Sequence, residues 1–212
     1  MTLGDVKIEA LKLMFTNVED DLFPKKLSNY IEDENYRDYL VNMPGAINRC
    51  FARLSEVGVL PSRRHALARE NALASASFVR YDLSAIPDFY DVERLIREDV
   101  YGDYEPDADY YREGDMLVLP RYEEGDGISY TLIYKPRLMP ISSITSNETV
   151  LDIPDDIAVL IPYFIKGDLY RIDEPNEAAE ARNWFESAIG EMLLRKTDKV
   201  NGIKSVYSLS EV

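Results

Sequence analysis

Apolar residues recur at helical spacing near the start of the chain. Residues 3–15 place apolar side chains every three or four positions, with Thr2 positioned as an N-cap and Asp5 as the acid of a capping box. A second helix is predicted over residues 44–57, which begin with a proline and end before Gly58, where a left-handed backbone costs little. Between these two helices, residues 20–42 predict irregular structure with short helical turns.

The same spacing returns after a connector rich in proline and serine at residues 138–153. Residues 154–172 form a continuous apolar face, in which Pro162 predicts either a kink or the start of a second helix. Asn176 is placed to cap a last helix, and residues 181–193 give that helix the cleanest apolar stripe in the chain. Both stripes need apolar partners, which the N-terminal helices would supply.

The middle of the chain alternates apolar and polar residues, a pattern typical of strands. Strands are expected at residues 78–83, 90–96, 110–113, 116–122 and 128–135. Turn-forming residues at 113–115 and 123–127 predict hairpin connections, so this part of the chain should form a small, mostly antiparallel β unit. Residues 62–76, just before it, fit either a helix or a loop.

The order of elements predicts an α+β fold. Helices from the two ends of the chain form a helical bundle, and the small antiparallel β unit is an insertion into it. The predicted parts are residues 1–76 with 154–196 as the helical bundle, 77–137 as the inserted β unit, 138–153 as a connector and 197–212 as a polar C-terminal tail with a short strand.

The composition is that of a folded protein with a strong negative charge. Hydrophobic residues make up 46% of the 212 positions, and 39 acidic residues outnumber 24 basic ones, for a net charge of -15. This charge disfavours wrapping of duplex DNA and fits either simple solubility or a neutral or cationic partner. No apolar run approaches the roughly 20 residues that span a bilayer, and the charged first helix is not a signal peptide. The 15 tyrosines suit a protein interface.

Nucleophilic catalysis has few candidates in this sequence. The one histidine, His65, lies beside Arg63 and Arg64, and no Gly-x-Ser-x-Gly turn is present to expose a serine. The one cysteine, Cys50, falls on the apolar stripe of a predicted helix, where a buried thiol acts as a small hydrophobic side chain. A disulfide within the chain and a Cys/His zinc site are therefore excluded.

Acidic residues are concentrated between positions 99 and 115, together with several tyrosines. The acidic run comprises Asp99, Asp103, Glu105, Asp107, Asp109, Glu113 and Asp115. Calcium binds oxygen-rich loops, but the ligand order of an EF-hand is missing, so a solvated loop or an interaction surface is the preferred interpretation. The basic cluster of Arg63, Arg64 and Arg69 could contact a phosphate or an acidic partner, although such clusters are usually just solvated. We assign no catalytic, cofactor-binding or metal-binding residue.

Five stretches of the sequence follow a recurring order of elements. They are residues 79–83 (VRYDL), 87–92 (PDFYDV), 130–134 (YTLIY), 153–170 (IPDDIAVLIPYFIKGDLY) and 177–186 (EAAEARNWFE). In that order, strands are followed by a loop, a helix started by proline, and a final helix rich in alanine and aromatic residues. The layout resembles that of tailed-bacteriophage neck proteins, in particular the adaptor, or head-to-tail connector, of short-tailed phages. It covers most of the chain as a pattern of elements without an invariant signature, so no functional residue is carried over.

The resemblance implies a structural virion protein with no enzymatic activity and no cofactor. In such adaptors a helical bundle carries an inserted β unit, and copies form a ring under the portal. For this chain it implies a homo-oligomeric ring in the virion, assembled in the cytoplasm of a host bacterium. The implied partners are the portal protein and tail or fibre proteins. Genome DNA would pass through the channel without specific binding, and no membrane is involved.

Three other interpretations remain open. The chain could form another virion part, such as a baseplate or tail-completion protein. It could be a carboxylate- or metal-dependent enzyme, which a metal in the acidic loop or a pocket with two close carboxylates would favour. It could also be an acidic regulatory module that binds one basic partner.

Overall fold

The structure is a computed structural model that divides the chain into two compact units. It describes residues 1–15, 34–68, 72–74, 77–99, 101, 104–106, 108–120 and 127–207, with side chains described as far as residue 196. Residues 1–59 and 140–212 form the helical unit, and residues 60–139 form the β unit. Helices and antiparallel strands are both abundant, which confirms the mixed helix-and-sheet class.

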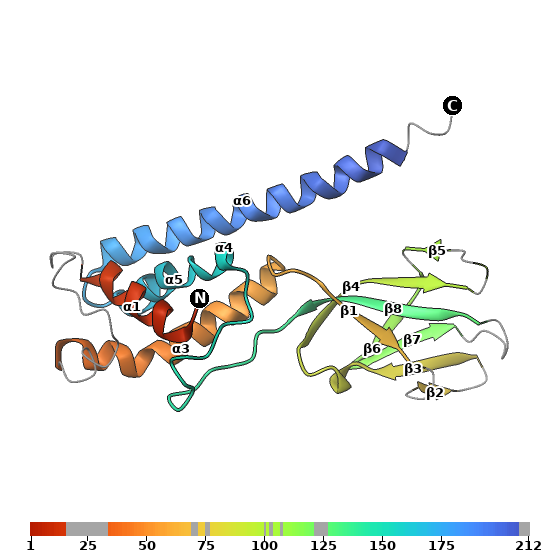
Figure 1. The fold of residues 1–212 in the computed structure, drawn as a ribbon, viewed down its shortest axis with the longest axis horizontal. Helices are drawn as coiled ribbons and strands as arrows, with labels where there is room; N and C mark the ends of the chain where they lie inside the picture. The colour runs from red at the N-terminus through yellow and green to blue at the C-terminus, as the bar shows by residue number, and fades with distance from the viewer. Residues whose placement is uncertain are drawn as a thin grey trace. The chain divides into compact units, whose positions relative to one another are not determined.

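The helical unit is drawn in red, orange, teal and blue in Figure 1. Its helices are α1 (Leu3–Met14), α3 (Glu34–Val57), α4 (Asp155–Ala158), α5 (Ile161–Leu169) and α6 (Pro175–Tyr207). The proline at position 162 lies in the first turn of α5, as expected of a residue that starts a second helix. Across the described residues, no helix is long and apolar enough to span a lipid bilayer.

Helix α5 is the shared packing partner of this unit. It contacts α1, α3 and α6, and Phe164 of α5 meets Phe185 of α6 edge to face with ring centroids 5.0 Å apart. The buried apolar residues include Leu3, Val6, Leu11, Met14, Ile47, Cys50, Phe51, Leu54, Ile161, Phe164, Ile165, Phe185 and Ile189. The apolar stripe of α5 is therefore buried against the N-terminal helices, as its spacing predicts.

Polar contacts hold both ends of α1. The capping box predicted from the sequence forms at its N-terminus. At its C-terminus, the carbonyl groups of Leu13 and Met14 accept hydrogen bonds from Lys166 Nζ (2.8 Å) and Tyr170 Oη (2.5 Å). Because the last carbonyls of a helix have no partner within it, these two side chains of the α5 region supply what α1 lacks.

The loop before α4 covers the start of α1. The amide of Leu3 donates to the carbonyl of Thr149 (2.9 Å), and the amide of Gly4 donates to the carbonyl of Asn147 (2.8 Å). A Cβ atom at Gly4 would lie 3.1 Å from that carbonyl oxygen, so the close approach of the loop depends on glycine. The loop is thereby fixed to the helix.

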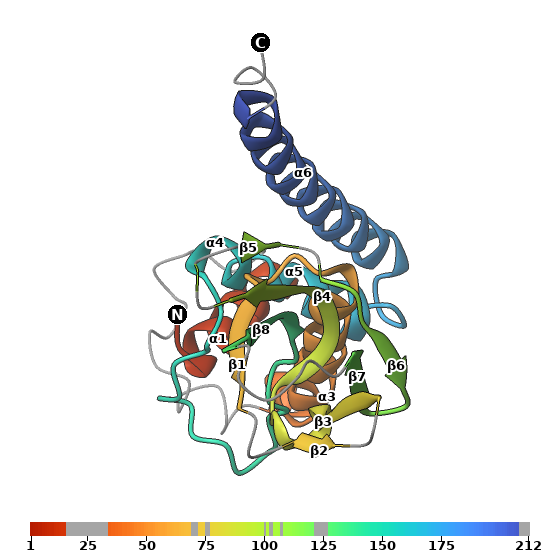
Figure 2. The ribbon, with the colours of Figure 1, turned by 90° about the vertical axis from the view of Figure 1, so that its right-hand side faces the viewer.

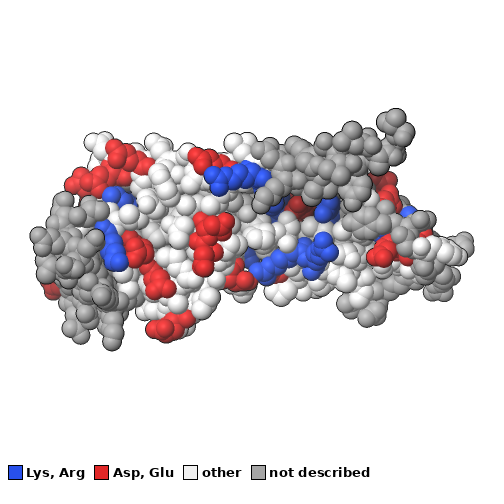
Figure 3. Space-filling view, turned by 45° about the horizontal axis from the view of Figure 1, so that its top comes forward, with Lys and Arg blue, Asp and Glu red and all other residues white. Residues whose placement is uncertain are grey.

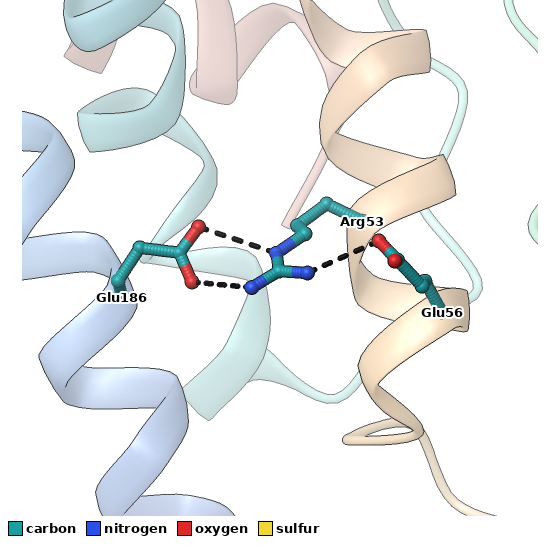
Figure 4. Close-up of polar contacts among 3 residues, drawn as sticks. All are labelled: Arg53, Glu56 and Glu186. Carbon is teal, nitrogen blue, oxygen red and sulfur yellow. Dashed lines mark hydrogen bonds and ion pairs between the residues drawn. The ribbon is translucent and has the colours of Figure 1, made fainter.

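An ion pair links α3 to α6 (Figure 4). Arg53 donates from Nε and Nη2 to the carboxylate of Glu186, at 3.2 and 2.9 Å, and from Nη1 to Glu56 at 3.1 Å. The side chains of Arg53 and Glu186 are 35% and 36% exposed, so the pair contributes about 1 kcal/mol at most. Its forked geometry fixes how the two helices face each other.

Helix α6 continues beyond its buried stripe. Its most buried residues are Ala178, Ala181, Phe185 and Ile189, at steps of three and four. The side chains described after Ile189 are all at least partly exposed, and Leu194 is 68% exposed. In Figures 1 and 2 the C-terminal part of α6, in dark blue, extends past the other helices of its unit.

The β unit contains two antiparallel sheets. Its strands are β1 (Arg63–Leu67), β2 (Ala72–Ala74), β3 (Phe78–Asp82), β4 (Phe89–Glu98), β5 (Tyr104–Glu105), β6 (Tyr111–Glu113), β7 (Met116–Pro120) and β8 (Ser129–Pro136). One sheet has the order β1-β8-β4-β5 and the other β2-β3-β7-β6. Side chains from both sheets share one buried core, including Leu67, Tyr81, Phe89, Leu95, Leu117, Leu119 and Leu132. Gly114, at φ 60°, makes the predicted turn between β6 and β7.

The β unit begins earlier than the sequence indicates. Residues 60–76, which we expected to belong to the helical bundle, fall in the β unit and carry β1 and β2. The segment RRHAL has no clear alternation, and it becomes a strand because its backbone pairs with β8. The predicted hairpin across residues 123–127 is also wrong, because β7 and β8 belong to different sheets. Alternation reports a buried face but does not identify the strand that pairs along each edge.

Two helices are longer than predicted. Helix α3 begins at Glu34 and holds Pro44 in its interior, whereas we expected Pro44 in the first turn. Helix α6 begins at Pro175, one residue before the expected cap Asn176, and extends to Tyr207, where a polar tail with a short strand at residues 205–209 was predicted. Residues 208–212 of that tail lie outside the described residues. Extending an existing helix needs no new nucleus, so polar residues can continue it. Conversely, Ile172 was expected in the apolar face and is 86% exposed.

A close approach of α5 and α6 can be tested at Gly167. A Cβ atom there would lie 3.1 Å from the carbonyl oxygen of Ala178 and 3.2 Å from the amide nitrogen of Arg182. Because it would press on the backbone of α6, Gly167→Ala is expected to lower the free energy of unfolding by about 1–2 kcal/mol. Urea denaturation followed by circular dichroism measures the change.

Gly190→Ala is the matched control, since no described heavy atom lies within 4 Å of a Cβ atom at that position of α6. Alanine should raise the free energy of unfolding there by about 1 kcal/mol through its helix propensity. Equal stabilisation by both substitutions would contradict the close approach at Gly167.

Candidate interaction surfaces

An open hollow of about 580 Å³ lies on the surface of the helical unit. Its lining residues come from the N-terminus, α1, the end of α4, the start of α5, and α6: Met1, Asp5, Glu9, Leu13, Val159, Pro162, Tyr163 and Trp184. Apolar and aromatic side chains form one part of the lining and two carboxylates form another.

Stacked aromatic rings contribute to this hollow. The rings of Tyr163 and Trp184 have centroids 3.8 Å apart and an interplanar angle of 27°. Trp184 is 46% exposed and Val159 is 50% exposed. A large aromatic ring that is held rigid and left half in water is typical of protein interfaces, because it buries much area on binding without losing side-chain freedom.

The acidic side chains of the hollow form hydrogen bonds with residues close to them in the sequence. Asp5 belongs to the capping box, and hydrogen bonds from the backbone and side chain of Thr2 lower the pKa of its carboxyl group. Glu9 accepts a hydrogen bond from Lys12 at 2.9 Å. The N-terminal amino group of Met1 pairs with Asp155 at 3.0 Å. The surface therefore suits a partner with apolar groups and neutral or positive charge.

Sequence reasoning placed Trp184 in the buried stripe of the last helix. The structure places the centre of the stripe at Ala181, Phe185 and Ile189, and Trp184 lies about 100° around the helix from Phe185. The signal available in the sequence was its position at the edge of the stripe, together with the low frequency of tryptophan in this chain.

The residues considered for nucleophilic catalysis lie in different units. His65 is exposed on strand β1. Cys50 is fully buried in α3, and burial raises the pKa of its thiol above the usual range. A protonated thiol enclosed by apolar side chains has neither the ionisation nor the access that a nucleophile needs.

The acidic run lies partly outside the described residues, which omit Asp103 and Asp107. Of its other members, Glu105 pairs with Arg97 at 3.4 Å and Glu113 with Arg80 at 3.1 Å. Throughout the described chain, no group of three or more His, Cys, Asp or Glu side chains is arranged to hold a metal ion. Nearby tyrosines are exposed, with Tyr101 at 90% and Tyr111 at 41%.

The described arginines of the basic cluster do not share one environment. Arg63 pairs with Asp88 at 2.6 Å, and Asp88 also accepts a hydrogen bond from Tyr134 Oη at 2.9 Å. Burial, followed by the contact with Asp88, raises the pKa of Tyr134 to about 12. Arg64 is exposed, and Arg69 lies outside the described residues. On the face seen in Figure 3, basic side chains form small groups interspersed with acidic ones.

No protein-family model matches this sequence, and no curated protein does so either.

The buried state of Cys50 can be tested with a thiol reagent. Because the thiol is enclosed and protonated, reaction should require unfolding, and the rate should fall about a thousandfold or more below that of the denatured chain. Time courses with an aromatic disulfide, in buffer and in concentrated urea, measure the ratio. Rapid reaction of the folded protein would contradict the burial.

Proposed function

We propose that this chain is a ring-forming adaptor of a tailed-phage virion, which joins the portal to the tail. The helices of the helical unit act as a bundle whose copies pack side by side, and the β unit contacts tail or fibre proteins. Genome DNA passes through the channel without specific binding. In this proposal the net charge of -15 repels the DNA phosphates.

The proposal rests on the order of the two units along the chain. The helical unit is built from both ends of the sequence, and residues 60–139 form a separate β unit between them. Helix α6 also continues to Tyr207, whereas Ile189 is the last buried position among its described side chains, which end at residue 196. This arrangement supports the resemblance to short-tailed-phage adaptors, in which a helical bundle carries an inserted β unit.

The hollow lined by Tyr163 and Trp184, called the Trp184 hollow from here on, supports side-by-side packing of copies. Ring contacts are heterologous, so each copy must present one surface that receives a different surface of its neighbour. An aromatic and apolar lining supplies the burial, and its acidic edge selects a basic or neutral counterpart. In this proposal the hollow is the receiving surface.

The C-terminal part of α6 supports contact with the portal. None of its described side chains from Gly190 to Lys196 is fully buried, and Leu194 is 68% exposed. Exposed positions on a continuing helix are available to bind another protein.

The particle formed with the portal tests the proposal directly. Cryo-electron microscopy of this protein mixed with the portal protein should show a closed ring of copies on one end of the portal. A monomer that binds a single cationic protein tightly and leaves the portal alone would favour the regulatory module, and the adaptor proposal would fail.

Trp184→Ala is expected to lower ring formation on the portal at least tenfold, because it removes most of the aromatic area of the hollow. Mass photometry of the mixture measures the ring population. Ile172→Ala is the control, since Ile172 is 86% exposed and does not line the hollow. Equal losses in the two variants would contradict a role of the hollow in ring assembly.

Deletion of residues 198–212 is expected to abolish portal binding while the fold remains intact. The residues removed follow Ile189, which is the last position of α6 that is buried among the side chains described as far as residue 196. Co-sedimentation with portal particles measures binding, and thermal unfolding checks the fold. Undiminished binding by the shortened chain would refute the docking role.

A further inference from the structure

A second hollow of the helical unit brings together hydrogen-bond donors and apolar side chains. It has a volume of about 290 Å³ and is bordered by α1, α3 and the loop before α4. Lys7, Arg37 and Asn147 provide its polar side, and Leu40, Val41 and Pro44 provide an apolar wall. No carboxylate is found among the described residues that line it.

Lys7 is buried with only part of its hydrogen-bonding capacity used. The residue is 7% exposed, and its Nζ donates to Asn147 Oδ1 at 2.8 Å. An ammonium group carries three N–H donors, so two remain without a partner in the described chain. Burial without an acidic partner lowers the pKa of the ammonium group. Keeping such a group buried is unfavourable unless an anion joins it.

The other polar groups of the hollow point to the same ligand charge. Asn147 is fixed because its carbonyl oxygen accepts a hydrogen bond from Gly4 at 2.8 Å. Its side-chain oxygen faces Lys7, which leaves the amide nitrogen as a further donor. Arg37 is exposed at the hollow, and no ion pair among the described residues engages it. In a chain with 39 acidic and 24 basic residues, two cations at one hollow with no acid among its described lining residues are a notable concentration of positive charge.

We infer that this hollow binds a carboxylate carried on an aliphatic stem. The two donors of Lys7 that have no partner among the described residues match the two oxygens of a carboxylate, and Arg37 can approach the same group from the solvent side. The apolar wall accommodates the stem, which an inorganic phosphate lacks. The ligand is either a small free carboxylate or an acidic side chain of another protein. This inference does not depend on the adaptor function.

Titration with butyrate, followed by the side-chain resonances of isotope-labelled lysine, tests the inference. We expect saturable shifts at Lys7 with a dissociation constant on the order of 1 mM, against chloride at matched ionic strength. A peptide with glutamate between two leucines, compared with its glutamine counterpart, distinguishes the two sources: tighter binding of the glutamate peptide than of butyrate identifies a protein side chain.

Variants of the two cations complete the test. Lys7→Met should weaken butyrate binding about tenfold or more, and Arg37→Gln should weaken it about threefold because that residue is exposed. Lys7→Met removes a buried charge, so it should fold and melt no lower than the wild type. Lys12→Met is the control on the same helix, since Lys12 pairs with Glu9 and does not line the hollow.

Three results would overturn the inference. They are unshifted Lys7 resonances up to saturating butyrate, stronger binding of inorganic phosphate than of butyrate, and undiminished butyrate binding by a folded Lys7→Met protein.

Discussion

The helical unit depends on the burial of α5. This short helix contacts α1, α3 and α6, which come from distant parts of the sequence. Lys166 of α5 and Tyr170, which follows α5, donate hydrogen bonds to the last carbonyl groups of α1. Both the apolar packing of the unit and the capping of α1 therefore depend on α5 and the residue that follows it. Because α6 approaches α5 at Gly167 within contact distance of its backbone, the two helices can be shifted only by opening that contact.

The same packing determines which surfaces are left exposed. Once Phe185 and Ile189 are buried toward α5, the helical repeat turns Trp184 toward solvent beside Tyr163. At the second hollow, the loop that covers the start of α1 brings Asn147 to Lys7. Each hollow is thus a consequence of core packing, and its lining belongs to elements that the core holds rigidly. Rigid side chains lose little freedom on binding, which favours their use in recognition.

The sequence predicted the elements that bury an amphipathic face and missed those that depend on distant pairing. The periodicity of α1 and α5, the capping box and the turn at Gly114 are local signals, and the structure confirms them. Strand β1 carries no comparable signal, because it exists through its pairing with β8 some 65 positions later. The length of α6 could not be predicted either, since its polar end lacks a stripe that would reveal it. The second hollow, called the Lys7 hollow here, could not be predicted for the same reason, because Lys7 and Asn147 meet only after the loop has folded onto α1.

Charge adds a further constraint on any assembly of this chain. Copies that each carry a net charge of -15 repel one another at long range, although salt screens that repulsion beyond roughly 8 Å. Association must therefore rest on short-range contacts, which means apolar burial or a local positive charge. The Trp184 hollow offers the first and the Lys7 hollow the second. Apolar burial is insensitive to salt, whereas an ion pair at Lys7 and Arg37 weakens as salt rises. Association that persists at high salt is therefore expected of the apolar lining of the Trp184 hollow and not of an ion pair at Lys7 and Arg37.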